Sequence, residues 1–370
     1  MQLFAHLLRV ATALLLPIGT VAQECSSREN YTARNQTEID TITQNCTTIV
    51  GELGLVDWSG PLTLPNITRI RSIRVYSGDI TAIELPSVTY LGSDLLLTNL
   101  PSLRRVSLPE LQHIEGLYVD LVGNAPELHI PRLTNASSIY IRGNISDQSF
   151  HSLRNVEKKL DICNAASCGY YSRMNAFTSM RLSFPSLERV GSLIVGGNVS
   201  SLSLPELTTL TCNDCDWVTL HLKLYGSSRI PVNLPKLTNT NGSLYIRGDI
   251  DSISLPSLRE YNRELIMTPY EPLDITLPVE RAKDFSFTGN VSSIKLPNLT
   301  DFTRIHINSD LDFDCDALWK DLEQTSGPLN ESSKEEYFQC SVGVSWQPGG
   351  SQAVTAVAAL GIGLVLGFLI

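Results

Sequence analysis

The side chains that could carry catalysis are scattered along this chain of 370 residues. Glycoside hydrolysis needs two carboxyl groups that face each other across a cleft, yet the sequence aligns no Asp or Glu pair on one expected strand face. Five histidines also lack Ser and Asp partners at the spacing of a catalytic motif, namely His113, His129, His151, His221 and His306. We therefore expect a non-enzymatic protein with no catalytic residues, cofactor or bound metal, and keep a β-helix polysaccharide-active enzyme as the alternative.

Aspartates alternate near the end of the chain in a way that could suit calcium, at Asp310, Asp312, Asp314 and Asp316. The EF-hand pattern fails, because Cys315 stands where glycine is needed and Asp321 where the bidentate glutamate belongs. Asp314 or Asp316 can instead cap a short helix over residues 314–324. We interpret these aspartates as helix caps and a solvated strand face.

Residues 1–22 have the layout of a secretory signal peptide. His6 and Arg9 precede the apolar run Val10–Ile18, and Thr20-Val21-Ala22 supplies small residues for cleavage. The apolar run is too short to span a bilayer. We therefore expect the remaining chain to mature in an oxidising compartment, where disulfide bonds form and sequons can be glycosylated.

The remaining chain holds eight cysteines, an even number that indicates disulfide bonds in such a compartment. We expect four local pairs, Cys25–Cys46, Cys163–Cys168, Cys212–Cys215 and Cys315–Cys340. A redox or zinc role for Cys212-Asn-Asp-Cys215 is an alternative, which the absence of a thioredoxin-like setting disfavours.

Asparagine sequons are spread over the whole chain, at Asn30, Asn35, Asn45, Asn66, Asn135, Asn144, Asn198, Asn241, Asn290, Asn298 and Asn330. We expect glycosylation at these sites, although Asn45 lies beside Cys46 and can be skipped. Asn144, Asn198 and Asn290 each follow a glycine at a corner, and we expect these corners to face solvent.

The end of the chain predicts a glycosylphosphatidylinositol (GPI) attachment signal over residues 341–370. Three small residues, Gly349-Gly350-Ser351, precede the spacer Gln352–Ala359 and the apolar end Leu360–Ile370. No Lys or Arg follows Lys334, whereas a spanning helix normally has cytosolic basic residues beside it. Gly349 is the predicted attachment residue, with Gly343 and Ser345 as lesser candidates.

A short repeated pattern organises everything between these segments, and it is clearest at Leu244–Leu258, Leu193–Leu207 and Phe285–Leu299. An apolar-x-apolar triplet indicates a very short strand. Gly followed by Asn or Asp then makes a corner, because these residues tolerate left-handed backbone angles. The segment Ile-x-x-Ile-x-Leu returns apolar side chains inward, and a proline ends it where no ladder donor is needed.

The expected strand centres are Gly54, Arg74, Leu96, Tyr118, Tyr140, Asp161, Ile194, Lys223, Tyr245, Ile266, Ser286 and His306. A step near ~21 residues, lengthened only on either side of Ile194, is typical of a solenoid whose stacked units share one core. We predict an all-β fold, a right-handed parallel β-solenoid of about twelve coils with short helical caps. The solenoid covers residues 49–313, with room for a break between two lobes near 163–180, and residues 23–48 and 314–340 form the caps.

Tyrosine and arginine recur at positions that these strands should turn outward. Tyr118 and Tyr140 should stack on adjacent coils with Arg142 beside them, and Tyr245 and Arg247 form the same pair further along. Tyrosine rings pack on the C–H faces of sugars, and arginine donates to their hydroxyls. These five residues are the candidate binding face. The alternative is that tyrosine merely favours exposed strand positions.

Three stretches carry a resemblance to a known family. They are Cys46-Thr47-Thr48-Ile49-Val50-Gly51, the Gly-Asn-[Ile/Val]-Ser and Leu-Pro-x-Leu repeats, and Cys315-Asp316-Ala317-Leu318 with Cys340. On these the chain, from roughly Cys25 to Ile370, resembles the fungal GPI-anchored cell-wall organisation proteins of the extracellular-mutant and sporulation-specific group, with repeats similar to receptor L-domains and leucine-rich repeats. Family members usually carry a long Ser/Thr-rich stretch before the anchor, whereas Ser341–Ser351 is short, which suggests a body held close to the membrane.

The resemblance implies a role in cell-wall assembly and integrity, at the outer face of the plasma membrane or in the wall. Its implied partners are wall polysaccharide or wall proteins, and it implies no catalytic residues. The net charge of −10, with no basic run, makes nucleic acid an unexpected partner.

Overall fold

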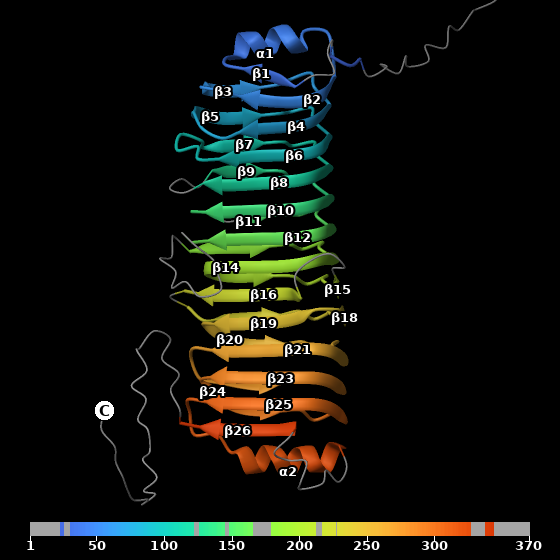
Figure 1. The fold of residues 1–370 in the computed structure, drawn as a ribbon, viewed down its shortest axis with the longest axis vertical. Helices are drawn as coiled ribbons and strands as arrows, with labels where there is room; N and C mark the ends of the chain where they lie inside the picture. Colours follow the sequence, from blue (N-terminus) through green and yellow to red (C-terminus); the bar gives the residue numbers. More distant parts are fainter. Residues whose placement is uncertain are drawn as a thin grey trace, which may run out of the picture.

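The computed structural model describes residues 23–25, 30–121, 126–144, 148–165, 179–211, 217–226, 228–326 and 337–343. Within them the chain forms a parallel β-solenoid of about twelve turns, a long rod with one short helix at each end (Figure 1). The predicted fold class is therefore confirmed. The predicted signal peptide, Gly349 with residues 344–370, Asn330, Cys168, Cys212 and Cys215 lie outside the described residues.

One long face of the rod is a large parallel sheet, called here the main sheet, that runs from one end to the other (Figure 1). Its strands follow in the order β1 (Tyr31–Ala33), β2 (Thr48–Leu55), β4 (Arg69–Val75), β6 (Tyr90–Thr98), β8 (His113–Leu121), β10 (Asn135–Gly143), β12 (Asn155–Asn164), β14 (Arg189–Ser203), β16 (Val218–Tyr225), β19 (Ser243–Gly248), β21 (Glu260–Pro269), β23 (Arg281–Gly289), β25 (Asp301–Ser309) and β26 (Phe338–Val342). Two short strands, β15 (Thr209–Leu210) and β18 (Asn239–Thr240), pair with each other at its edge, and β15 also pairs with β14.

Shorter parallel sheets form a second side of the rod, after the Gly-containing corners. They comprise β3 (Ser59–Thr63), β5 (Asp79–Glu84), β7 (Arg105–Ser107) and β9 (Glu127–His129); β11 (Gln148–Ser149) with β13 (Met180–Ser183); β17 (Ile230–Asn233) with β20 (Ile250–Ser254); and β22 (Leu273–Thr276) with β24 (Val291–Lys295). β14 is long enough to turn the corner, so its second half pairs with β13.

The core is one continuous apolar cluster along the rod, because every coil sends alternate side chains inward. In the clearest repeat, Ile246, Ile250, Ile253 and Leu255 are all buried, as the pattern predicts. Each such side chain contributes about 1.5–3 kcal/mol through its removal from water. Stacking thus supplies the stability that a single coil cannot.

The predicted strand centres lie side by side over Gly54–Ile194 and again over Tyr245–His306. The prediction of Lys223 as the centre between these series is wrong by two residues, because His221 pairs with both Ile194 and Tyr245. A shift of two residues keeps every side chain on its own face, so Lys223 still belongs to the outward row.

The main sheet also continues past residues 163–180, where the sequence left room for a break between lobes. β12 pairs directly with β14 over most of its length, from Asn155 to Asn164. The additional residues of the two long steps therefore leave the stacking order of the strands unchanged.

The N-terminal cap contains the predicted short helix, α1 (Gln36–Thr43). Asn35 caps it, since its side chain accepts a hydrogen bond from the backbone N–H of Glu38 at 3.0 Å. The predicted Cys25–Cys46 disulfide is present and ties the start of the cap to the residues after α1. Strand β1 was not predicted; it extends the main sheet into the cap by pairing with β2.

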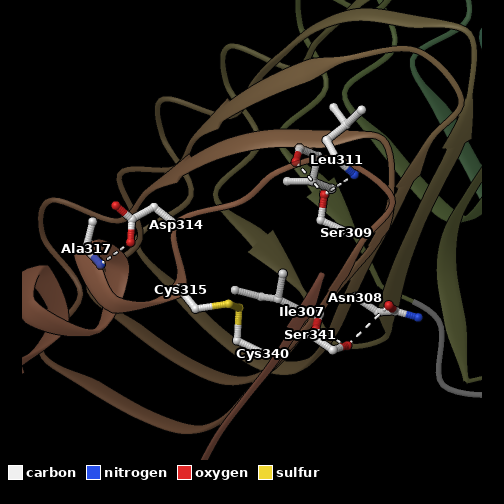
Figure 2. Close-up of a disulfide and its surroundings, with 10 residues drawn as sticks. Ile307, Asn308, Ser309, Leu311, Asp314, Cys315, Ala317, Cys340 and Ser341 are labelled. Carbon is white, nitrogen blue, oxygen red and sulfur yellow. Dashed lines mark hydrogen bonds between the residues drawn. A yellow bond between two sulfur atoms is a disulfide. The ribbon is translucent and has the colours of Figure 1, made fainter. Parts of the chain in front are cut away.

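The C-terminal cap is the helix α2 (Cys315–Ser326), and Figure 2 shows how it is fastened. The Asp314 carboxylate accepts a hydrogen bond from the Ala317 N–H at 2.8 Å, which supports the capping interpretation of that aspartate. The predicted Cys315–Cys340 disulfide joins α2 to β26. The cap therefore includes a strand of the main sheet that the sequence did not reveal.

Candidate functional site

The first part of the candidate binding face is a pair of stacked tyrosines. Tyr118 of β8 and Tyr140 of β10 are paired across the main sheet, and their rings lie 5.0 Å apart with an interplanar angle of 13°. Both side chains are half-buried, and the Lys159 ammonium lies 5.9 Å from the centre of the Tyr140 ring. Burial, then the charge of Asp94, raises the pKa of Tyr118. At neutral pH the stack is an uncharged aromatic platform.

Arg142 stands beside this platform and is anchored by the next strand. Its Nη2 donates to Asp161 Oδ2 at 2.6 Å, and the Asp161 side chain is only 3% exposed. The second carboxylate oxygen, Oδ1, is buried and has no hydrogen-bond partner. Asp161 thus fixes the orientation of Arg142, but at the cost of an unsatisfied oxygen.

The second part of the face, around Tyr245 and Arg247 on β19, has different neighbours. Tyr245 meets His221 edge to face, with ring centres 6.1 Å apart, rather than another tyrosine. His221 and Lys223 are buried although they belong to the outward rows of β16. Burial, then the charges of Lys223, Arg247 and Lys159, lowers the pKa of His221 to about 4. The imidazole is therefore neutral at physiological pH.

Arg247 is held by Tyr270, which in turn contacts Tyr225, and neither tyrosine was identified from the sequence. The Nε and Nη2 of Arg247 donate to the Tyr270 hydroxyl at 3.2 and 2.9 Å. The Tyr225 hydroxyl lies 3.0 Å from that of Tyr270, across two coils. Tyr225 and Tyr270 come at or just after the ends of β16 and β21, and this position at the carboxyl edge of the sheet was the only available signal. Burial, followed by the hydrogen bond with Tyr270, raises the pKa of Tyr225.

An exposed tryptophan adds a further aromatic surface near the start of β16. Trp217 is 79% exposed, and the Arg263 guanidinium lies 5.5 Å from the centre of its ring. Arg263 also donates from Nε to the Asn241 carbonyl at 3.1 Å. Tryptophan with an arginine alongside repeats the chemistry of the tyrosine–arginine pairs.

The carboxylates of the outward face mostly serve as partners for arginines. Arg74 contacts Glu52 at 3.1 Å and Asp94 at 3.6 Å, and Arg304 contacts Asp284 at 3.4 Å. These ion pairs join side chains of neighbouring strands on the outward face.

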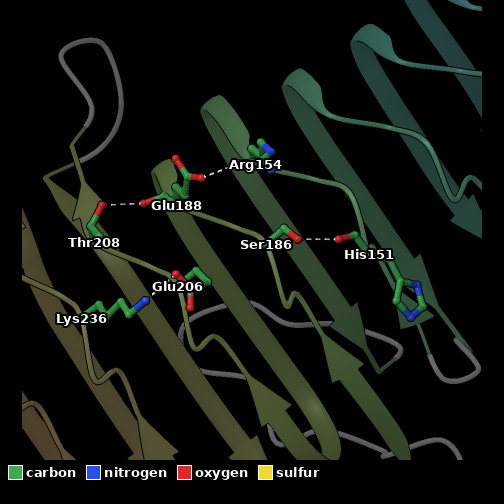
Figure 3. Close-up of polar contacts among 7 residues, drawn as sticks. All are labelled: His151, Arg154, Ser186, Glu188, Glu206, Thr208 and Lys236. Carbon is green, nitrogen blue, oxygen red and sulfur yellow. Dashed lines mark hydrogen bonds and ion pairs between the residues drawn. The ribbon is translucent and has the colours of Figure 1, made fainter.

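The turns that follow the prolines of the Leu-Pro-x-Leu motifs, called here the proline edge, are joined from coil to coil by ion pairs and hydrogen bonds. Figure 3 shows part of this edge. Arg154 pairs with Glu188, Lys236 pairs with Glu206, and Thr208 donates to the Glu188 carbonyl. The paired side chains are exposed, so each contributes at most about 1 kcal/mol. We interpret this edge as scaffold.

The same edge brings a serine beside a histidine without forming a catalytic pair. The Ser186 hydroxyl donates to the backbone carbonyl of His151 at 2.7 Å, and the His151 imidazole points elsewhere (Figure 3). Nucleophilic catalysis requires the serine to contact the ring nitrogen. Within the described part of the chain, no group of three His, Cys, Asp or Glu side chains is arranged to hold a metal ion.

The sequon asparagines differ in their exposure. Among the described residues, those that are exposed are Asn30, Asn35, Asn45, Asn66, Asn135, Asn241 and Asn298. The three corner asparagines, Asn144, Asn198 and Asn290, are half-buried and thus less exposed than the other described sequon asparagines. The corners pair along the rod, and the Asn290 side-chain amide donates to the Tyr270 carbonyl.

The two middle disulfide predictions rest on residues that are only partly described. Cys163, at the end of β12, is buried and disulfide-bonded. Cys168, Cys212 and Cys215 lie outside the described residues, so both pairings stay predictions. Among the helices of the described residues, none has the length and apolar character needed to cross a bilayer.

No family model, no curated protein and no solved structure matches this chain.

Proposed function

We propose that this protein is a non-enzymatic, GPI-anchored surface glycoprotein that contributes to fungal cell-wall organisation and integrity by binding wall polysaccharide or a wall protein. The observation that carries the proposal is the Tyr118–Tyr140 stack with Arg142 held beside it by Asp161. Stacked rings on neighbouring strands offer a flat apolar surface, and the arginine supplies donors at its margin.

The rod shape supports a role in binding extended ligands. Tyr140 and Tyr245 are separated by four strand steps along the main sheet, from β10 through β12, β14 and β16 to β19. At ~4.8 Å per step this is about 19 Å. A polymer chain or a partner's surface can span this distance, whereas a small molecule reaches only one of the two parts.

The binding face is tested with a triple variant, Tyr118→Ser, Tyr140→Ser and Tyr245→Ser, in the full anchored chain. We expect normal secretion, because half-buried outward side chains contribute little to the core, and a loss of binding to isolated wall and of wall-stress resistance. Tyr90→Ser is the matched control, since Tyr90 stacks on His113 at 5.0 Å at the other end of neighbouring strands. Unchanged binding and stress resistance in the triple variant would assign the tyrosines to the scaffold.

Release of soluble sugar from the wall by the purified protein would instead support the enzyme alternative.

The anchor is tested separately. Phospholipase treatment of intact cells should release the protein, and a chain that ends at Ser351 should be secreted in soluble form because it lacks the apolar end. Retention after phospholipase treatment would indicate wall cross-linking or a membrane span, and retention of the truncated chain would place the attachment elsewhere.

A further inference from the structure

Three side chains on the C-terminal half of the main sheet form what we call the donor corner: Tyr225, Arg247 and Tyr270. Tyr225 and Tyr270 lie on coils on either side of β19, and Arg247 of β19 reaches the hydroxyl of Tyr270. The positions of the hydroxyl protons in this group follow from which atoms can donate and which can accept.

Arginine has donors only, so the Tyr270 oxygen must accept from both Nε and Nη2 of Arg247. A hydroxyl oxygen has two lone pairs, and these two hydrogen bonds occupy both. The contact between the two hydroxyls is then a donation from Tyr270 to the oxygen of Tyr225. The O–H of Tyr225 is consequently free to donate to another group.

Arg247 supplies a second set of donors at the same place. Its Nη1 carries two further N–H groups, and neither these nor the Tyr225 O–H finds a partner among the residues that the structure describes. Arg247 and Tyr225 both contact the single oxygen of Tyr270, so the two side chains meet at this point of the main sheet. Both side chains are half-buried, so they remain within reach of a ligand.

Lysines and one carboxylate lie around the donor corner, in a protein whose net charge is −10. Lys223 of β16 is level with Arg247 of β19, and its ammonium lies 5.7 Å from the centre of the Tyr225 ring. Burial and the charge of Arg247 lower the pKa of Lys223, and Lys159 adds its charge to the field at His221. Asp249 is the nearby carboxylate, and its Oδ2 is occupied by the Gly226 N–H at 3.0 Å.

We propose that Tyr225 and Arg247 form a subsite that binds the oxyanion of an acidic glycan, with Tyr270 as the positioning residue and Lys223 as a source of positive charge. O–H and guanidinium donors suit the oxygens of a carboxylate or phosphate, which accept several hydrogen bonds. The glycan part of this assignment rests on the proposed function, because the tyrosine face of the same sheet would hold the sugar rings. The carboxylate of a uronic acid and the phosphate of a phosphorylated sugar share the chemistry required.

Binding to matched pairs of oligosaccharides tests the subsite. The purified full ectodomain is titrated by calorimetry with trigalacturonate and its methyl ester, and with a phosphorylated oligomannose and its dephosphorylated form. We expect at least one acidic form to bind about tenfold or more tightly than its neutral counterpart, since charge-assisted hydrogen bonds are lost in the neutral form. Whichever pair shows the difference identifies the carboxylate or the phosphate as the source.

Variants assign the effect to the donor corner. Tyr225→Phe removes only the hydroxyl, Arg247→Lys keeps the charge but not the fork of donors, and both should abolish most of the preference for the acidic form. Tyr90→Phe, the same change on a half-buried tyrosine outside both the donor corner and the candidate binding face, should leave the preference intact. Equal binding of acidic and neutral forms by the parent protein, or a full preference in Tyr225→Phe, would overturn the subsite. Loss of neutral-form binding in the triple tyrosine variant tests the proposed function independently, so the two can fail separately.

Discussion

The carboxylate of Asp161 is bound by Arg142 through one oxygen at 2.6 Å, while its other oxygen is buried without a hydrogen bond. The two residues lie on neighbouring strands of the main sheet, two residues out of register, and Asp161 itself is level with Tyr140 on one side and Ile194 on the other. Without Arg142, the buried carboxylate of Asp161 would keep its charge and lose its partner. The pair therefore stabilises the protein only while both side chains are present.

The first prediction concerns this pair. Arg142→Ala should lower the free energy of unfolding by about 1–3 kcal/mol, because it leaves the buried carboxylate of Asp161 unpaired. In an Asp161→Leu background the same Arg142→Ala change should cost less than about 0.5 kcal/mol, since no buried charge is then abandoned. Chemical denaturation of the four proteins gives the coupling energy. If Arg142→Ala lowered the free energy of unfolding equally in the two backgrounds, Arg142 and Asp161 would not stabilise each other.

The repeat pattern was sufficient to predict most of the stacking register, and its failure at Lys223 has a physical cause. The sequence Val218–Tyr225 alternates leucines with polar residues throughout, so sliding the strand by two residues buries an equally good apolar set. Several other coils carry a glycine at this corner that marks the register, namely Gly143, Gly197, Gly248 and Gly289. Here the position level with Gly197 and Gly248 is Leu224, so the marker was missing.

The binding face could be predicted only where its residues lie level with each other on adjacent strands. The Tyr118–Tyr140 stack follows from the period, because the two residues are direct neighbours in the parallel pairing. Tyr225 and Tyr270 contact each other although strand β19 lies between their strands, because their long side chains meet beside Arg247. No spacing rule identifies such a contact, so the donor corner had to come from the structure.

The second prediction concerns the corner of the clearest repeat. Gly248 has a φ of +121°, and a Cβ placed there would lie 1.8 Å from the Leu224 carbonyl oxygen. Gly248→Ala should therefore cost more than about 3 kcal/mol and sharply reduce secretion, because backbone on the neighbouring coil must move. Gly54→Ala is the control, since its nearest obstacle is 3.7 Å away, and it should be secreted like the parent. Secretion and thermal unfolding of Gly248→Ala at parental levels would show that the corner can relax.

The third prediction concerns the core. Ile250 is fully buried on β20, so Ile250→Asp places a charge without a partner among apolar side chains and should block secretion. Ser252→Asp introduces the same carboxylate on the same strand at an exposed position and should leave secretion unchanged. The measurement is the amount of each variant outside the cell relative to the amount inside. Normal secretion of Ile250→Asp would show that the inward register of this coil is wrong.

The fourth prediction concerns pH. The folded protein holds the pKa of His221 at about 4, below the ordinary value of 6.5, mainly through burial and then through the charges of Lys223, Arg247 and Lys159. The unfolded chain therefore binds a proton in the pH range between these values that the folded protein does not. By linkage the free energy of unfolding rises with pH over this range, and it falls as the pH drops from about 6.5 to about 4, by up to about 3 kcal/mol.

Replacing His221 isolates its share of this acid sensitivity. His221→Gln should lose less stability than the parent between pH 7 and pH 4.5, because the carboxylates that also titrate there are common to both proteins. His129→Gln is the matched control, since His129 is exposed on β9, and its stability profile should follow the parent. The measurement is the unfolding temperature across the pH range. Parallel profiles for His221→Gln and the parent would mean that the buried imidazole takes up its proton as readily in the folded protein as in the unfolded chain.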